Sequence, residues 1–156
     1  MTQSPVPFPA RLRLLESSIV KVQTTPSGGI DVLFNVTGGP ILVTRLVGIV
    51  TTILAGTANG TLKTTTTTPA GTTSLSTTVA ITDDAAGTSY RFVGATGVLT
   101  PVTAGPKIID PVTVEDCQFL VPIGNVNFVT TAAMTGAITW YMSFVPLSPE
   151  SVVSAA

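Results

Sequence analysis

The chain contains no histidine and only one cysteine among its 156 residues. The missing histidine excludes serine–histidine and cysteine–histidine nucleophilic machinery, and it removes the commonest metal-binding side chain. A single cysteine excludes an intrachain disulfide and a structural zinc site built on several cysteines. We interpret Cys117 as a small buried hydrophobic residue. These absences predict a protein that is not an enzyme and that needs no cofactor or metal.

Charged residues are scarce as well. They make up 10% of the chain, against roughly 25% in a typical soluble domain, whereas hydrophobic residues make up 44%. Either the folded domain buries much of its surface against partners, or threonine hydroxyl groups alone are enough to solvate that surface. The net charge is −1, and the seven basic residues are scattered apart from Arg11 and Arg13. This distribution argues against a nucleic-acid partner.

The sequence lacks a recognisable leader and a membrane span. Prolines occupy the N-terminal positions where a signal peptide would have a basic and then an apolar region. The longest apolar run, residues 40–55, is too short for a spanning helix and contains Arg45. We therefore expect a soluble, unprocessed protein with no membrane partner.

Strand-forming residues dominate what is present. Residues 31–56 form two runs rich in Val, Ile, Leu and Phe, joined by the turn sequence Thr-Gly-Gly-Pro at 37–40. The second run is apolar on both faces, which predicts a strand covered on both sides. We predict that the two runs pair as a hairpin at the centre of an all-β domain.

Further segments also have strand character. The alternation over 75–82 predicts a half-buried strand, and that over 125–132 predicts another. In residues 137–145, Ile138, Trp140, Met142 and Phe144 share one face. The threonine-rich run 62–68 predicts a strand without a buried face, at an edge or on an outer loop. Eight to ten strands with turns between them indicate an antiparallel β-sandwich or barrel, jelly-roll-like.

The ends of the chain differ from its middle. Alternating prolines predict an extended N-terminal arm over residues 1–10, followed by a single β domain over 11–146 and a C-terminal tail over 147–156. We expect both ends to reach onto neighbouring subunits. The candidate interface residues are Pro5, Pro7, Phe8, Pro9, Arg45, Pro146, Leu147 and Pro149.

Three features allow more than one interpretation. Asp83 and Asp84 at a glycine-containing turn favour simple turn formation, with a calcium site as the rarer alternative. Arg45, inside an apolar strand, either pairs with a carboxylate or reaches across an interface, or else lies at a strand edge with its charge in solvent. Trp140 is expected in the core rather than on a ligand-stacking platform, and exposure of Trp140 and Tyr141 in a groove would favour a binding role.

Three stretches carry a resemblance: LFNVTGGPILVTRLVGIVTT at 33–52, VAITDDAAGT at 79–88 and GAITWYMSFVPLSP at 136–149. Together they resemble small structural proteins of tailed bacteriophages, over most of the chain from Leu33 onward. The resemblance implies a head decoration, or cement, protein that forms β-rich trimers on the outer capsid shell. It supplies no catalytic residues.

The expectation from these observations is therefore a virion protein, made in the host cytoplasm, that binds the major capsid protein and copies of itself as a homotrimer. The alternative is a receptor- or glycan-binding module of a phage head or tail fibre.

Overall fold

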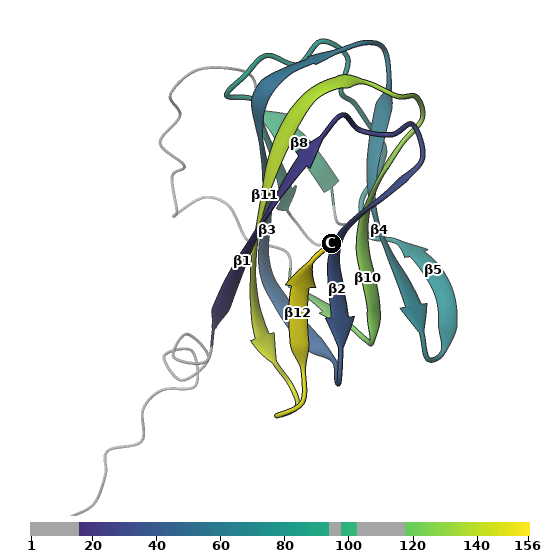
Figure 1. The fold of residues 1–156 in the computed structure, drawn as a ribbon, viewed down its shortest axis with the longest axis vertical. Helices are drawn as coiled ribbons and strands as arrows, with labels where there is room; N and C mark the ends of the chain where they lie inside the picture. The colour runs from purple at the N-terminus through teal and green to yellow at the C-terminus, as the bar shows by residue number, and fades with distance from the viewer. Residues whose placement is uncertain (1–15, 94–97, 103–117) are drawn as a thin grey trace, which may run out of the picture.

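Two antiparallel sheets face one another in the part of the chain that the computed structural model describes, residues 16–93, 98–102 and 118–156 (Figure 1). The described residues are in strands, turns and loops, so no helix among them is available to span a membrane. The predicted all-β sandwich is confirmed. The N-terminal arm, with Pro5, Pro7, Phe8 and Pro9, and also Cys117 lie outside the described residues.

Sheet I contains six strands in the order β1, β11, β3, β7 and β8, with β9 beside β3. Their bounds are β1 Ser17–Thr24, β3 Ile41–Ala55, β7 Ser89–Val93, β8 Val98–Val102, β9 Phe119–Val121 and β11 Thr135–Pro146. Sheet II has the order β12, β2, β10, β4 and β5, with β6 beside β4. Their bounds are β2 Ile30–Thr37, β4 Asn59–Thr67, β5 Ala70–Ser74, β6 Val79–Ala80, β10 Gly124–Thr130 and β12 Val152–Ala155.

The antiparallel pairs are nested along the chain. The pair β4 with β5 is innermost, and around it lie β3 with β7, β2 with β10, and β1 with β11. The strands β1 to β4 alternate between the two sheets, and β10 and β11 alternate again on the return. This arrangement is that of a jelly roll, in which a long folded ribbon wraps around one core. The jelly-roll-like topology expected from the sequence is therefore present.

The predicted central hairpin is wrong, because β2 and β3 lie in opposite sheets. The connection through Gly38 and Gly39 crosses the sandwich instead of turning back along one sheet. Its glycines allow close contact with the C-terminal segment: a Cβ atom on Gly38 would lie 1.9 Å from the backbone oxygen of Glu150. The hydroxyl of Ser151 donates to the carbonyl oxygen of Pro40 over 2.8 Å and holds that contact.

A β-bulge explains why β3 is apolar on both faces. Val43 is paired with Phe144 and Arg45 with Ser143, so Thr44 is an extra residue in β3. Before this point the odd-numbered Val43 faces the core, and after it the even-numbered Leu46 does; both are buried. The bulge at Thr44 switches the core-facing residues of β3 from odd to even numbers. A sequence pattern that assumes strict alternation cannot locate such a switch.

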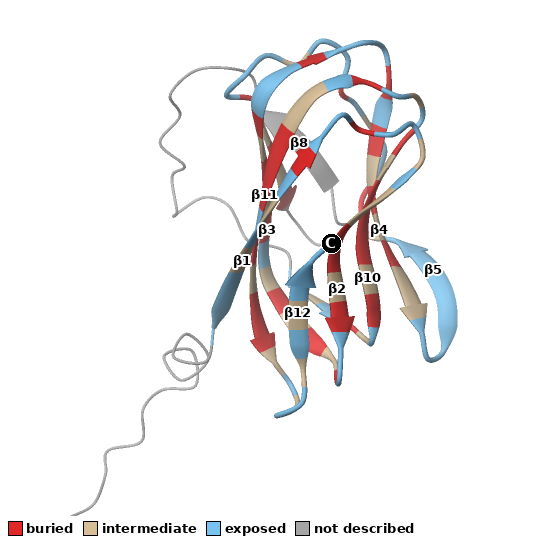
Figure 2. Ribbon diagram, in the orientation of Figure 1, coloured by how far each residue is buried: buried red, intermediate tan, exposed pale blue. Residues whose placement is uncertain are grey.

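Three aromatic side chains occupy the centre between the sheets. Trp140 and Tyr90, from sheet I, stack with ring centroids 6.3 Å apart, and Trp140 lies 5.0 Å from Phe128 of sheet II. All three have no exposed surface, which confirms the core position predicted for Trp140. Figure 2 shows buried stretches, in red, along β2, β10 and β11. Gly48 lies between Trp140 and Tyr90 in the sheet register, and a Cβ atom there would lie 2.7 Å from the indole ring. The missing side chain leaves room for the two rings.

A polar chain links this core to both sheets. The indole N–H of Trp140 donates to the side-chain oxygen of Gln23 over 2.9 Å. The amide nitrogen of Gln23 donates to a carboxylate oxygen of Asp31 over 2.8 Å, and the backbone N–H of Ser27 donates to that same oxygen. The buried indole and the buried Gln23 therefore both have hydrogen-bond partners, as buried polar groups generally require.

The predicted position of the threonine-rich strand is wrong. Strand β4 is an interior strand between β10 and β5, and Leu62 and Thr64 on its inner face are buried. The short segment 70–74, rich in Thr and Ser, was not expected as a strand, yet it pairs with β4 and forms the edge instead. Since its five residues are all exposed, no hydrophobic pattern indicates it.

The strand predicted over residues 75–82 is also wrong, because only β6 within it is a strand. The backbone N–H groups of Leu75 and Ser76 both donate to the carbonyl oxygen of Leu62, and the regular ladder ends there. The hydroxyl of Ser76 then accepts from the N–H of Leu62 over 2.9 Å, which stabilises the departure from the sheet.

The C-terminal tail predicted over 147–156 requires a correction as well. Its last residues form β12, which pairs with β2 of the same chain, and the N–H of Ala156 donates to the carbonyl oxygen of Leu33. Val153 packs against the core from this strand. Residues 147–151 form the turn that joins β11 to β12.

We predict that Gly48→Ala destabilises the protein by about 1–3 kcal/mol, because the added methyl group overlaps the indole of Trp140 and overpacks the core. Urea unfolding measures the change in the free energy of unfolding. The matched control is Gly71→Ala in the exposed strand β5, where the nearest atom to a Cβ, the Thr66 hydroxyl oxygen, is 3.9 Å away. Equal losses in the two variants would contradict the role assigned to Gly48.

Candidate functional site: the outer face of sheet I

Exposed and partly buried apolar side chains form adjacent rows across the outer face of sheet I. Val20 of β1 pairs with Tyr141 of β11, and Tyr141 pairs with Val47 of β3. In the next row, Val22 of β1 and Ile49 of β3 flank Thr139. Val20, Val22 and Tyr141 are 49%, 57% and 44% exposed. We call the set Val20, Val22, Val47, Ile49 and Tyr141 the outer apolar face.

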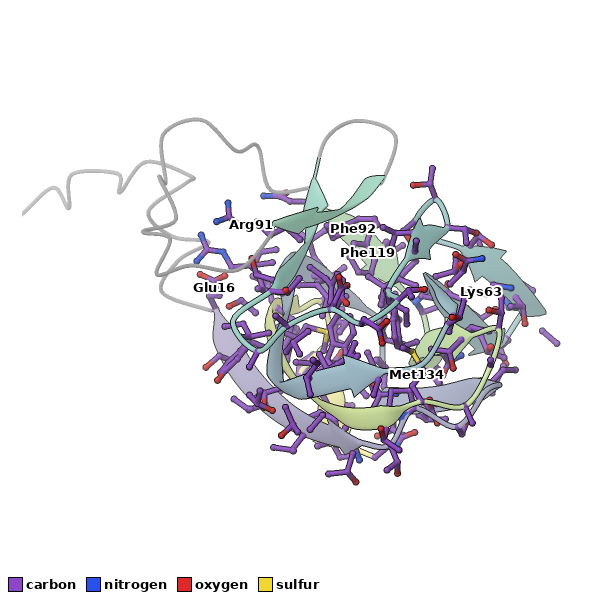
Figure 3. All side chains as sticks on the ribbon, turned by 90° about the horizontal axis from the view of Figure 1, so that it is seen from above. Glu16, Lys63, Arg91, Phe92, Phe119 and Met134 are labelled. Atoms are coloured by element: carbon purple, nitrogen blue, oxygen red, sulfur yellow. The ribbon has the colours of Figure 1, made fainter. Side chains whose placement is uncertain are left out.

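Two arginines border the outer apolar face. Arg91 of β7 pairs with Val47, and Arg45 lies two residues from Val47 on the same side of β3. Arg45 is exposed, whereas the Nε atom of Arg91 is enclosed without a hydrogen-bond partner in the described structure. Figure 3 shows Arg91 and Glu16 on one side of the molecule and Lys63 on the other. A carboxylate of Glu16 accepts from the hydroxyl of Thr44 beside Arg45.

The remaining predicted interface residues lie elsewhere. Pro146 ends β11, and Leu147 and Pro149 belong to the turn before β12. This turn is held at its base, because the N–H of Leu147 donates to the carbonyl oxygen of Pro40 over 3.1 Å. Leu147 is 50% exposed and Pro149 is exposed. The described structure therefore separates the candidates into two places, with Arg45 on the sheet and residues 146–149 at the turn.

The outer face of sheet II has a different chemistry. A row of uncharged polar residues crosses it in register from β12 to β5: Ser154, Asn35, Asn125, Thr65 and Thr72. The side-chain amide of Asn127 donates to the hydroxyl of Thr65 over 2.9 Å, while its buried oxygen lacks a partner among the described residues. The two outer faces of the sandwich thus differ, one apolar with arginines and the other amide- and hydroxyl-rich.

The carboxylates considered for calcium accept hydrogen bonds from groups outside their own turn. Asp83 accepts from the backbone N–H of Gly56 over 3.2 Å, and Asp84 accepts from the hydroxyl of Tyr90. Across the described ranges, no group of three or more Cys, Asp or Glu side chains is arranged to hold a metal ion. The geometry therefore supports turn formation at Asp83 and Asp84.

Burial raises the pKa of Tyr90 far above its ordinary value of 10.0, and the hydrogen bond and negative charge of Asp84 add to the increase. The neutral phenol is therefore strongly favoured in the folded state. Tyr90 fixes the Asp83–Asp84 turn to the aromatic core, where its ring stacks on Trp140.

Sequence reasoning missed Val20 and Val22 as surface residues of interest, whereas it had singled out Tyr141. In β1 the signal was present, since Ser18, Val20, Val22 and Thr24 alternate with residues that face inward. The burial of Trp140 and Tyr141 was expected to distinguish a structural role from a binding role, and the two residues give opposite results. Trp140 is fully buried, whereas Tyr141 is half-exposed. Burial of Trp140 favours the structural interpretation, whereas exposure of Tyr141 leaves one aromatic ring available at the surface.

Comparisons with protein-family models, with curated proteins and with solved structures find no match to this chain.

We predict that Tyr90→Phe lowers the free energy of unfolding by about 1–2 kcal/mol at pH 7, because the hydrogen bond to Asp84 is lost. Above about pH 10 the unfolded wild-type chain loses the phenol proton that the folded chain retains, so wild-type stability falls by up to about 1.4 kcal/mol per pH unit. The variant lacks this contribution, and the difference between the two proteins should shrink as the pH rises.

Urea unfolding between pH 7 and pH 11 tests this expectation. Tyr141→Phe serves as the matched control, since it removes a hydroxyl from the outer apolar face instead of the core, and it should follow the wild type. A stability difference between wild type and Tyr90→Phe that stays constant to pH 11 would count against it.

Proposed function

We propose that this protein is a structural component of a tailed-bacteriophage virion, made in the host cytoplasm, that binds the outer surface of the shell formed by the major capsid protein and stabilises it. Copies of the chain associate with one another, as a homotrimer in the resemblance described above, and the assembled unit decorates the shell. The protein acts by adhesion and has no catalytic role.

The observation that carries this proposal is the outer apolar face. Three of its side chains are roughly half exposed and lie on two adjacent strands, β1 and β11. Contiguous exposed apolar surface on a soluble domain is typical of an interaction site. Covering such surface gains roughly 25 cal/mol per Å² of apolar area removed from water. The low charge of the chain, 15 charged residues in 156, agrees with a surface that is partly covered in use.

The repetition of identical sites on a shell strengthens the attachment of the assembled unit as a whole. A shell offers many identical sites, so an oligomer that reaches several of them gains apparent affinity without any additional contact type. A modest interface per copy can therefore brace neighbouring shell subunits. The rigid jelly roll suits this use because its surface residues keep their relative positions when the contact forms.

A receptor- or glycan-binding module is the second candidate. The row Ser154, Asn35, Asn125, Thr65 and Thr72 on sheet II favours it, because amides and hydroxyls match the hydrogen-bonding groups of sugars. Tyr141 adds one accessible ring, but it lies on the other sheet, and Trp140 is inaccessible. The aromatic ring and the polar row therefore do not form one site.

We predict that the purified protein co-sediments with shells lacking it and raises the temperature at which those shells break down. The variant Val22→Glu with Tyr141→Glu should weaken shell binding at least about tenfold, since charges on the outer apolar face oppose the association of copies and so reduce multivalent attachment. Sedimentation with increasing protein concentration measures the affinity.

Thr72→Glu on the exposed strand β5 is the matched control and should bind like the wild type. Circular dichroism establishes that the variants remain folded. Shells that neither retain the wild-type protein nor gain heat resistance from it would refute the proposal, and retention on glycan arrays in place of shells would favour the second candidate.

A further inference from the structure

We propose that the C-terminal turn of one copy, residues 147–151, docks on the outer apolar face of a second copy beside Arg45 and Arg91. The inference rests on the self-association included in the proposed function and names the two surfaces that meet. Both surfaces are present on every chain, so each copy offers one donor turn and one acceptor face.

Glu150 differs from the other described acidic residues. Glu16, Asp31, Asp83 and Asp84 each accept a hydrogen bond through a carboxylate oxygen: from Thr44, from Gln23 and Ser27, from Gly56, and from Tyr90, respectively. The Glu150 carboxylate accepts none among the described residues, and the residue is exposed. It is the one described acid whose charge is not already engaged within the chain.

Apolar surface accompanies this carboxylate. Leu147 is 50% exposed at one end of the turn, and Val152 is 57% exposed at the start of β12. The turn and the first residue of β12 thus combine one acidic side chain with two apolar side chains and the exposed Pro149. The outer apolar face combines valines and Tyr141 with two arginines, which is the complementary composition.

The turn is also rigid before contact. The Ser151 hydroxyl donates to the carbonyl oxygen of Pro40 and accepts from the N–H of Ser148, and the N–H of Glu150 donates to the Ser148 hydroxyl. Gly38 lies directly against the backbone of Glu150. A preformed turn loses little conformational freedom on docking, which favours affinity.

Charge also distinguishes the turn from residues 1–15 as an occupant of the face. Residues 1–15 contain Arg11 and Arg13 and no acidic residue, so they would place like charges beside Arg45 and Arg91. Like charges brought together at an interface oppose association. The acidic turn of a second copy avoids that repulsion and supplies the opposite charge.

The two surfaces lie on different parts of the chain, the turn beside the β2–β3 connection and the acceptor face on β1, β11 and β3 (Figure 1). Contacts between unlike surfaces are heterologous, and they close into a ring when the rotation between copies permits. A ring of this kind accounts for an oligomer such as a trimer with a single type of interface.

Charge reversal tests the pairing on the full-length protein in the absence of shells. Arg45→Glu and Glu150→Arg should each weaken self-association at least about tenfold, because each places like charges across the interface. The double variant restores opposite charges and should return to within about threefold of the wild type. Analytical ultracentrifugation over a range of concentrations gives the masses and dissociation constants.

Lys63→Glu, on the outer face of sheet II, is the matched control and should associate like the wild type. Circular dichroism and urea unfolding check that Arg45→Glu and Glu150→Arg remain folded; if Arg45→Glu unfolds, Val22→Glu replaces it and should also weaken association. A wild-type monomer at all concentrations, or a double variant no better than the single variants, overturns the inference. Shell binding by such a monomer would leave the shell-binding part of the proposed function standing, whereas an intact oligomer that ignores shells would remove that part and keep the interface.

Discussion

The packing of the Trp140 indole holds the two sheets of this sandwich together. The ring lies over Gly48 in its own sheet, meets Phe128 from the opposite sheet and stacks on Tyr90. Its N–H needs a partner in the dry interior, and Gln23 of the edge strand provides one. The Trp140 side chain thus packs against a glycine on β3 and an aromatic residue on β10, and it hydrogen-bonds to a polar residue that faces inward on β1. Much of the remaining core is arranged around these contacts.

The jelly roll determines which surfaces remain for contact with other molecules. Because the nested pairs wrap one core, each sheet has a buried inner face and an accessible outer face. On sheet I the outer positions are occupied by valines, isoleucine and Tyr141, whereas on sheet II they are largely Asn, Thr and Ser. The bulge at Thr44 contributes to this division, since it turns Arg45 outward in a strand whose sequence is apolar on both sides. The apolar character of the outer face of sheet I therefore follows from composition and local geometry together.

Sequence reasoning succeeded where a strand alternates regularly and faces the core on one side. Ile138 and Met142 were placed correctly on the inner face of β11 together with Trp140, and the position of Val126 on β10 follows the same rule. It failed for β2 and β3, because adjacent apolar runs with a glycine turn suit a hairpin and a crossing between sheets equally well. Sequence reasoning also failed for β5, whose residues are all exposed and which is a strand only because its backbone pairs with β4.

By itself the amino-acid sequence determined the β character of the chain, the core role of Trp140 and the shortage of groups suited to catalysis, because these follow from residue type and from short-range alternation. Only the tertiary structure decided that β2 and β3 separate, that the C-terminal residues return to pair with β2, and that Val20, Val22 and Tyr141 form one surface. Those features depend on hydrogen bonds and registers between residues far apart in the chain. The pattern within a single strand contains no information about which neighbour it will pair with.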